Sequence, residues 1–344
     1  MTEPWREHLD AGQVIPACPL TLTDDGSWSR RHQRGLVRYY LDAGAGGIAV
    51  GVHTTQFAIR DAQYGLYEPV LRLVSETLDQ QLAQQPRPFV RVAGICGDTA
   101  QATAEAAMAR AIGYHAGLLT TNAVRDRAEH QILDHCRAVA DVIPVFGFYL
   151  HPAVGGRVYS VDFWREFCKI QNVVAIKIAA FNRYQTLDVI RAVIESGRAD
   201  IAIYTGNDDN IINDLLTPFR FGGQQRRIVG GLLGQWAVWT QRAVEMLAEI
   251  KQVREQETIA AEWLAANARL TDSNAAIFDA ANDFAGCIPG VNEVLRRQGL
   301  TPSNRCLDPG EVLSAGQSEE IDRVCREQQT DDDFVAAHID RWLA

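Results

Sequence analysis

The sequence predicts an α/β fold: a (β/α)8 TIM barrel followed by an all-helical C-terminal extension. Eight short runs rich in apolar and β-branched residues alternate with longer amphipathic stretches, and the connections between them are short. Eight such units fit within about 250 residues, the usual size of this barrel. A doubly wound open sheet usually carries a GxGxxG turn after its first strand, and no such turn stands there.

The expected strands follow one another along the first 235 residues. A strand of a parallel sheet is buried on both faces, so it is a short apolar run without alternation. The runs are Val14–Pro19, Gly47–Val52, Phe89–Ala93, Ala116–Thr121, Ile143–Phe148, Val173–Ile178, Ile201–Tyr204 and Arg227–Leu232. Amphipathic helices are expected between them, at Arg31–Ala43, Tyr67–Gln84, Ala100–Ile112, Ala128–Val142, Ser160–Lys169 and Arg183–Glu195.

Helical periodicity replaces this alternation after Trp236. The expected helices, separated in part by prolines and glycines, are Val238–Arg254, Thr258–Leu270, Ile277–Gly299, Ser318–Gln328 and Asp332–Ala344. We therefore expect two regions, a barrel over residues 1–235 that carries the active site and a helical extension over residues 236–344.

The composition excludes several classes of protein. The chain has 33 Lys and Arg against 43 Asp and Glu, a net charge of −10, which argues against nucleic-acid binding. No apolar run approaches the length of about 20 residues that a membrane span needs, and the polar N-terminus does not resemble a signal peptide. Seven scattered cysteines without a CxxC pair indicate neither a zinc ribbon nor a redox motif. A cytoplasmic location is expected.

Lys177 is the residue that most strongly suggests chemistry. It ends the expected strand that begins at Val173, after four apolar residues. Burial disfavours the ammonium form and lowers the pKa of a lysine, and a neutral amine can attack a carbonyl to form a Schiff base. The structural alternative is an ion pair with a neighbouring carboxylate.

Other polar groups are expected at the same end of the barrel. The active site of a (β/α)8 barrel lies at the carboxyl ends of its strands. The residues that follow the expected strands, and that would converge with Lys177, are His53, Thr54, Thr55, Tyr149, His151, Gly206, Asp208 and Gly231. An amine, a phenol and two hydroxyls at one mouth suit carbonyl chemistry with proton transfer.

The chain resembles the N-acetylneuraminate lyase / dihydrodipicolinate synthase superfamily of Schiff-base (class I) aldolases, as a divergent member. The resemblance covers most of the chain and rests on the order of five segments. These are Ile15–Thr21 with Asp25 and Gly26, Gly47–Thr55 (family Gly-Thr-Thr-Gly-Glu), Phe148–Pro152 (family Tyr-Asn-x-Pro), Ala175–Lys177 (family Gly-Ile-Lys) and Thr205–Asp208 (family Gly-x-Asp). The 28-residue step from Tyr149 to Lys177 also matches the family.

This resemblance implies a lyase that acts on pyruvate or another 2-oxo acid by aldol cleavage, condensation or dehydration. Lys177 would form the Schiff base and Tyr149 would transfer protons. Thr54 and Thr55 would bind the substrate carboxylate, and Thr54 would relay protons to Tyr149. His53, Gly206, Asp208 and Gly231 are further candidates for substrate binding. The resemblance implies no cofactor and no metal, and a homo-oligomer, either dimer or tetramer.

The departures from the family pattern favour a substrate other than that of dihydrodipicolinate synthase. Gln56 and Phe57 replace the Gly-Glu pair, Leu150 replaces the asparagine, and Ile178 replaces the acid after the lysine. The arginine that synthases carry after Tyr-x-x-Pro is missing, which favours sugar-acid or aromatic 2-oxo acid chemistry.

Two other hypotheses stay open at this point. One is a metal-dependent barrel aldolase or hydratase that uses His53, His151 and Asp208, because imidazoles and carboxylates bind divalent metals. The other is a catalytically silent barrel that binds a 2-oxo acid.

Overall fold

The computed structural model describes residues 3–344 and confirms the predicted barrel. Eight parallel strands form one sheet in the order β1-β10-β7-β6-β5-β4-β3-β2. The strands are β1 (Val14–Pro16), β2 (Gly47–Val50), β3 (Val90–Ile95), β4 (Ala116–Leu119), β5 (Val145–Leu150), β6 (Val173–Ala179), β7 (Ala202–Thr205) and β10 (Gly230–Leu233). Each of the eight overlaps one of the apolar runs found in the sequence.

The sheet closes between its first and second strands. A parallel bridge joins Ala17 to Ala49, and the Cys18 N–H donates to the Ala49 carbonyl at 2.8 Å. The amino end of the barrel is covered by α1 (Pro4–Asp10), where the Leu9 carbonyl accepts a hydrogen bond of 2.6 Å from the Tyr204 hydroxyl. Because α1 covers the amino end of the barrel, the open end of the barrel lies at the carboxyl ends of the strands.

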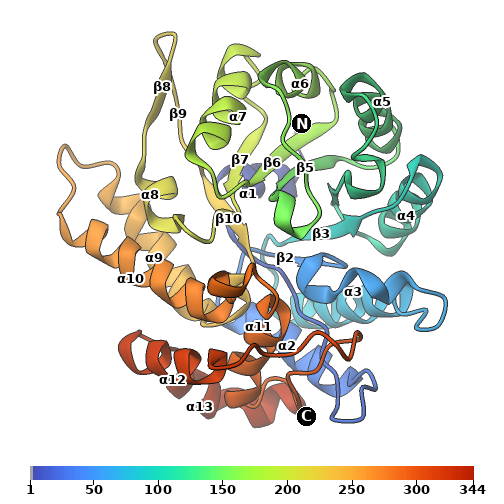
Figure 1. Cartoon of the computed structure of the whole chain (residues 1–344), viewed down its shortest axis with the longest axis vertical. Helices are drawn as coiled ribbons and strands as arrows, with labels where there is room; N and C mark the ends of the chain where they lie inside the picture. The colour runs from blue at the N-terminus through green and yellow to red at the C-terminus, as the bar shows by residue number, and fades with distance from the viewer. Residues whose placement is uncertain (1–2) are drawn as a thin grey trace.

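Helices surround the sheet (Figure 1). They are α2 (Arg30–Asp42), α3 (Tyr67–Gln84), α4 (Thr99–Ile112), α5 (Glu129–Ala140), α6 (Val161–Phe167), α7 (Arg183–Glu195), α8 (Ile211–Leu216) and α9 (Thr240–Val253). Polar caps fix several of their starts; Asp98, for example, accepts from the Gln101 N–H at 3.0 Å at the start of α4. A hairpin of β8 (Phe219–Phe221) and β9 (Gln224–Arg226), absent from the sequence prediction, projects from the body of the molecule (Figure 1).

The C-terminal extension contains α9 and four further helices, and these four lie together on one side of the barrel, coloured orange to red in Figure 1. They are α10 (Glu262–Ile277), α11 (Cys287–Arg297), α12 (Gln317–Glu327) and α13 (Asp332–Leu343). Helix α13 packs on α2, where Arg38 donates to the Trp342 carbonyl at 2.5 Å. No helix within residues 3–344 is long and apolar enough to cross a membrane.

The structure corrects one element of the extension. A continuous helix was predicted over Ile277–Gly299, but α10 ends at Ile277 and α11 begins only at Cys287. The backbone between them leaves the helical region because Asp279, Asp283 and Phe284 adopt positive φ angles of 59°, 52° and 67°. The Asp279 carboxylate holds this segment by accepting from the Gly286 N–H at 3.0 Å and from the Ser314 hydroxyl.

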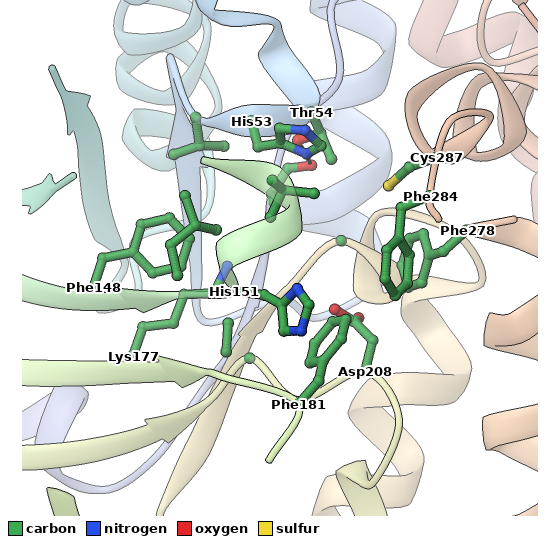
Figure 2. A pocket seen from close by; sticks show the side chains of 17 residues that line it. His53, Thr54, Phe148, His151, Lys177, Phe181, Asp208, Phe278, Phe284 and Cys287 are labelled. Atoms are coloured by element: carbon green, nitrogen blue, oxygen red, sulfur yellow. Dashed lines mark hydrogen bonds between the residues drawn. The ribbon is translucent and has the colours of Figure 1, made fainter. Parts of the chain in front are cut away.

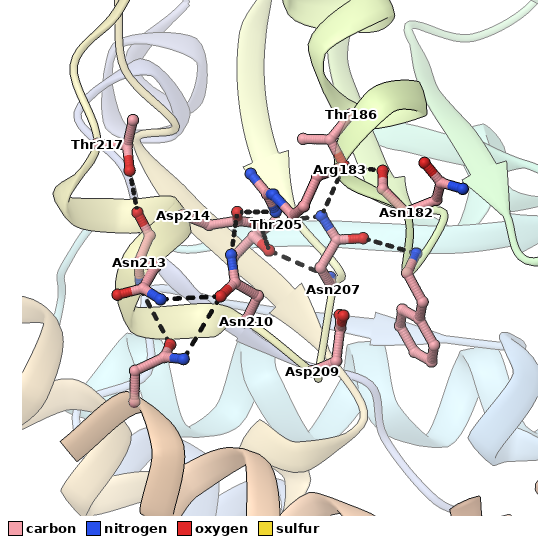
Figure 3. Close-up of polar contacts among 12 residues, drawn as sticks. Asn182, Arg183, Thr186, Thr205, Asn207, Asp209, Asn210, Asn213, Asp214 and Thr217 are labelled. Carbon is pink, nitrogen blue, oxygen red and sulfur yellow. Dashed lines mark hydrogen bonds and ion pairs between the residues drawn. The ribbon is translucent and has the colours of Figure 1, made fainter. Parts of the chain in front are cut away.

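A buried polar network ties the loop after β6 to the loop after β7 (Figure 3). At its centre is the fully buried carboxylate of Asp214 on α8. This carboxylate accepts from the Thr205 hydroxyl at 2.7 Å, from the Asn207 amide at 2.9 Å and from the Arg183 guanidinium at 2.5 Å. Asn207 in turn accepts from the Phe181 N–H at 3.0 Å. The network therefore fixes two loops at the open end of the barrel.

We expect the Asp214→Ala substitution to destabilise the protein by about 3 kcal/mol, because it leaves a buried hydroxyl and a buried amide without their acceptor. The matched control is Asp162→Ala, which removes a carboxylate from an exposed pair with Arg165 and should change stability by less than about 1 kcal/mol. Urea denaturation followed by far-UV circular dichroism measures both. Equal midpoints for the two variants would show that the network does not stabilise the fold.

Candidate active site

A pocket with an empty volume of about 670 Å³, part of it open to solvent, lies at the carboxyl ends of the strands. Its wall combines residues at strand ends with residues of the C-terminal extension. The residues that line it are Ala17, Val52, His53, Thr54, Phe148, Leu150, His151, Val154, Lys177, Ala179, Phe181, Gly206, Asp208, Gly234, Phe278, Phe284 and Cys287. The predicted location of the site and the observed cavity therefore coincide.

Lys177 extends from β6 toward this cavity, with Phe148 beside it (Figure 2). In the register of the sheet Lys177 pairs with Phe148, so both side chains face the barrel interior, and the Lys177 Nζ lies 4.5 Å from the centre of the Phe148 ring. The lysine is only 8% exposed. Gly206 provides the space, because a Cβ atom at that position would lie 2.4 Å from the Lys177 Cε. The aliphatic part of the Lys177 side chain therefore lies between the Phe148 ring and the backbone of Gly206.

Burial dominates the electrostatics of the pocket. It lowers the pKa of Lys177 below its ordinary range, and the charge of Asp208 opposes this shift only in part. Burial also raises the pKa of Asp208, with Lys177 opposing. For His53, burial together with the charge of Lys177 lowers the pKa to about 4, so the imidazole is neutral at physiological pH. Burial therefore shifts the pKa of each of the three groups in the direction that favours its neutral form, relative to the same group in water.

The structure does not bring Tyr149 to the pocket, contrary to the sequence-based expectation. Tyr149 pairs with Ile178 and points to the opposite face of the sheet from Phe148 and Lys177. Its ring packs against Tyr159 and Trp164 outside the barrel, with centroid distances of 6.0 and 5.0 Å, and its hydroxyl accepts from the Tyr159 N–H at 3.3 Å. The phenol is fully buried there and its pKa is raised by that burial.

The two threonines after β2 have different positions. Thr54 lines the pocket, and its hydroxyl donates to the Ala17 carbonyl at 2.7 Å. Thr55 is fully buried behind the wall, where its hydroxyl donates to the Cys18 carbonyl at 2.7 Å and accepts from the Gly51 N–H at 3.0 Å. Thr55 therefore fixes the turn after β2, and only Thr54 can contact a ligand in the cavity.

Of the remaining candidate residues, four line the pocket and one does not. His53, His151, Gly206 and Asp208 all line the pocket. Gly231 does not, because a Cβ atom at that position would point at the Trp236 ring, 2.6 Å away. The His151 Nδ1 accepts from the Ala153 N–H at 3.2 Å, and its ring stacks on Phe181 with 5.5 Å between centroids.

The lining residues that were not identified from the sequence include four aromatic rings and a thiol: Phe148, Phe181, Phe278, Phe284 and Cys287. Phe148 and Phe181 lie on or just after strands β5 and β6, so the strand-end rule could have found them. Nothing in the sequence indicated Phe278 and Phe284, because their segment has the amphipathic pattern of a helix. Burial raises the pKa of the Cys287 thiol, so it is protonated and a poor nucleophile.

The geometry does not favour the metal-dependent alternative. His53, His151 and Asp208 line one cavity, but within residues 3–344 no three or more His, Cys, Asp or Glu side chains are grouped so that they could hold a metal ion. His151 instead has one ring nitrogen bonded to backbone and its ring face covered by Phe181.

Comparison with solved structures places the barrel among known relatives. CdNal from Clostridium difficile, solved in complex with mannosamine, matches with a TM-score of 0.73 and 14% identity over 92% of this chain and 98% of its own. A dihydrodipicolinate synthase from Acinetobacter baumannii, complexed with pyruvate, matches with a TM-score of 0.74 and 18% identity over 92% and 98%. A dihydrodipicolinate synthase from Bacillus anthracis gives 0.72 and 19% over 93% and 99%.

At these identities the structural likeness establishes the shared fold. A search of curated protein sequences found no match. The model of the dihydrodipicolinate synthetase family, in contrast, matches residues 10–327, which is nearly the whole chain. The chain therefore belongs to the dihydrodipicolinate synthetase family.

Proposed function

We propose that this protein is a lyase that forms a Schiff base between Lys177 and a 2-oxo acid, with pyruvate as the first candidate. The observation that supports this most strongly is the buried amine at the end of β6, held in an apolar pocket that favours its neutral form. Family membership and the pyruvate complex of the synthase from Acinetobacter baumannii support the same class of chemistry. The reaction is aldol cleavage or condensation, or dehydration of a 2-oxo acid.

The amine would begin the reaction by attacking the C2 carbonyl of the 2-oxo acid. Loss of water from the carbinolamine gives an iminium, and this cation accepts the electron pair released when a bond at C3 breaks. The substrate carboxylate adds a negative charge to a pocket that already contains Asp208. Because burial favours the neutral acid form of Asp208, the repulsion between the two groups is reduced.

His53 and Asp208 are the groups that we assign to proton transfer. Both line the cavity, whereas the Tyr149 hydroxyl lies on the other face of the sheet. The neutral His53 imidazole can accept a proton, and a carboxyl group whose pKa is raised toward neutrality can donate or accept one. Thr54 lines the same wall, but the one proton of its hydroxyl is already donated to the Ala17 carbonyl.

A pyruvate adduct trapped with borohydride tests the proposed nucleophile. The chain contains three lysines, Lys169, Lys177 and Lys251, so peptide mass spectrometry assigns the site without ambiguity. We expect the reduced adduct on Lys177. Lys177→Met should abolish it, whereas Lys169→Met, which removes an exposed lysine paired with Glu166, should leave it unchanged. Failure to trap any 2-oxo acid at Lys177 would refute the proposal.

The pH dependence of trapping should report the unusual amine. Because burial lowers the pKa of Lys177, the trapping rate should rise with pH and level off well below pH 10.4, the ordinary pKa of a lysine. The Asp208 carboxylate stabilises the ammonium, so Asp208→Asn should move the inflection to still lower pH. Asp209→Asn is the control, since the charges that act on the pKa of Lys177 are those of Asp208 and Cys287 and do not include that of Asp209. A shift to higher pH in Asp208→Asn would contradict the assignment.

Exchange of the pyruvate methyl protons with deuterium distinguishes the proton carriers. This exchange requires an enamine on Lys177 and a group that moves protons, and NMR measures it without knowledge of the second substrate. Tyr149→Phe should exchange within about twofold of the wild type, because the phenol is outside the pocket. Asp208→Asn should be slower by about 100-fold, a usual contribution of general acid–base catalysis, because the pKa of Asp208 is raised toward neutrality, whereas a pKa of about 4 makes His53 a weak base. The reverse ranking would return the proton-transfer role to Tyr149.

A further inference from the structure

We infer that the second substrate of this site is an uncharged aromatic aldehyde, so that the 2-oxo acid it joins or cleaves carries an aryl group. This inference rests on the proposed Schiff-base function and specifies its substrate class. It comes from the wall of the pocket that faces Lys177, which supplies rings and few hydrogen-bonding groups.

Three rings gather at one side of the cavity (Figure 2). The centroids of His151 and Phe181 lie 5.5 Å apart, those of Phe181 and Phe284 5.6 Å apart, and those of His151 and Phe284 6.0 Å apart. These separations are within the range of favourable ring–ring contacts, and all three residues line the cavity. A flat aromatic group entering the pocket would therefore meet ring faces and edges.

The same wall has little to offer a polyhydroxylated or doubly charged partner. The Thr54 hydroxyl already donates to the Ala17 carbonyl, and one oxygen of Asp208 already accepts from the Gln235 N–H at 3.2 Å. Of the residues that the structure describes, Lys177 is the one lysine or arginine in the lining. Sugar hydroxyls buried here would find few partners, namely His53, His151 and the second oxygen of Asp208, and a second carboxylate would lack a counter-charge.

Arg157 does not supply that counter-charge. It is the arginine nearest in sequence to the position at which synthases carry one, but its guanidinium donates to the carbonyls of Arg125 and Arg127 at 2.7 and 2.9 Å. The group also stacks on the ring of Tyr159, 5.2 Å from the centroid, outside the cavity. The positive charge is therefore used to fix surface loops.

The rings of His151, Phe181 and Phe284 form the aromatic wall of the pocket, and the backbone that carries two of them is constrained. Phe181 and Phe284 have positive φ angles of 49° and 67°, conformations that bulky side chains rarely adopt and that persist where the surroundings impose them. For Phe181 the constraint is the hydrogen bond from its N–H to Asn207, and for Phe284 the bond from its N–H to the Asp279 carbonyl at 3.0 Å. The backbone that carries both rings is thus fixed before any ligand arrives.

The cleavage reaction balances with these groups alone. A 4-aryl-4-hydroxy-2-oxo acid forms an iminium at C2 with Lys177 and releases water. The C3–C4 bond breaks, its electron pair forms the enamine, and the C4 hydroxyl gives its proton to the pocket base as the aryl aldehyde leaves. The enamine is protonated at C3, and water then hydrolyses the iminium to release pyruvate and the amine. Condensation is the same sequence in reverse.

Condensation rates with saturating pyruvate test the inference. The probes are benzaldehyde, D-glyceraldehyde as a polyhydroxylated aldehyde, and succinic semialdehyde as a charged one. Because the intrinsic reactivities of these aldehydes differ, each is measured with the wild type and with variants. Benzaldehyde should have the highest kcat/KM with the wild type.

Phe181→Asn removes one ring of the wall while retaining a residue that tolerates a positive φ. It should lower kcat/KM for benzaldehyde roughly tenfold, about the contribution of one favourable ring contact. The rates with the other two aldehydes, and borohydride trapping of pyruvate, should fall by a clearly smaller factor, so that the preference for benzaldehyde is reduced. Tyr184→Asn is the control, since this aromatic residue of α7 is 82% exposed and does not line the cavity.

The outcomes separate the two proposals. A pyruvate adduct on Lys177 together with a preference for glyceraldehyde or succinic semialdehyde, or with no reaction of benzaldehyde, overturns the aromatic assignment and leaves the Schiff-base function intact. An equal loss for all three aldehydes in Phe181→Asn also overturns it. Absence of the adduct overturns the proposed function, and the aromatic assignment with it.

Discussion

The site depends on keeping one amine in surroundings that do not stabilise its charge. Lys177 lies beside the face of Phe148, against the backbone of Gly206 and beneath a wall of apolar side chains. Each of these contacts removes water from the amine, and each requires a particular strand register or a particular loop. The closed sheet, the bare glycine after β7 and the docked extension are therefore parts of one arrangement, in which burial lowers the pKa of the Lys177 amine.

The pocket is lined by residues of both the barrel and the extension, so the site needs both regions. The network around Asp214 fixes Phe181 through Asn207, and Asp279 fixes the segment that carries Phe284. Rings from both regions then meet over the cavity. The boundary expected near residue 235 falls between β10 and α9. The cavity is lined by residues from both sides of this boundary, so the division into two domains stays a prediction.

The sequence predicted the barrel well because strands buried on both faces are short apolar runs, and these need no tertiary information to recognise. It also placed Lys177, His53, Thr54, Gly206 and Asp208 at the mouth, since strand ends converge by construction. Tyr149 was placed wrongly because side chains alternate along a strand, and the strand-end rule does not say which of two neighbouring residues faces inward; Phe148 pairs with Lys177 and Tyr149 with Ile178. The break after Ile277 could not be foreseen, since it depends on contacts from Ser314 and Gln317 far along the chain. The expected homo-oligomer and the cytoplasmic location stay predictions.

Part of the pocket wall comes from residues late in the chain, and this has a consequence for synthesis on the ribosome. Strands β1 to β10 are complete at Leu233, but Phe278, Phe284 and Cys287 follow some distance later. A chain emerging from its N-terminus can therefore assemble the barrel while the amine still faces water on that side. The part of the pocket wall that comes from the extension, and that helps to exclude water from the amine, is absent from such a barrel. The pocket is complete only after the segment up to Cys287 has been translated and has docked.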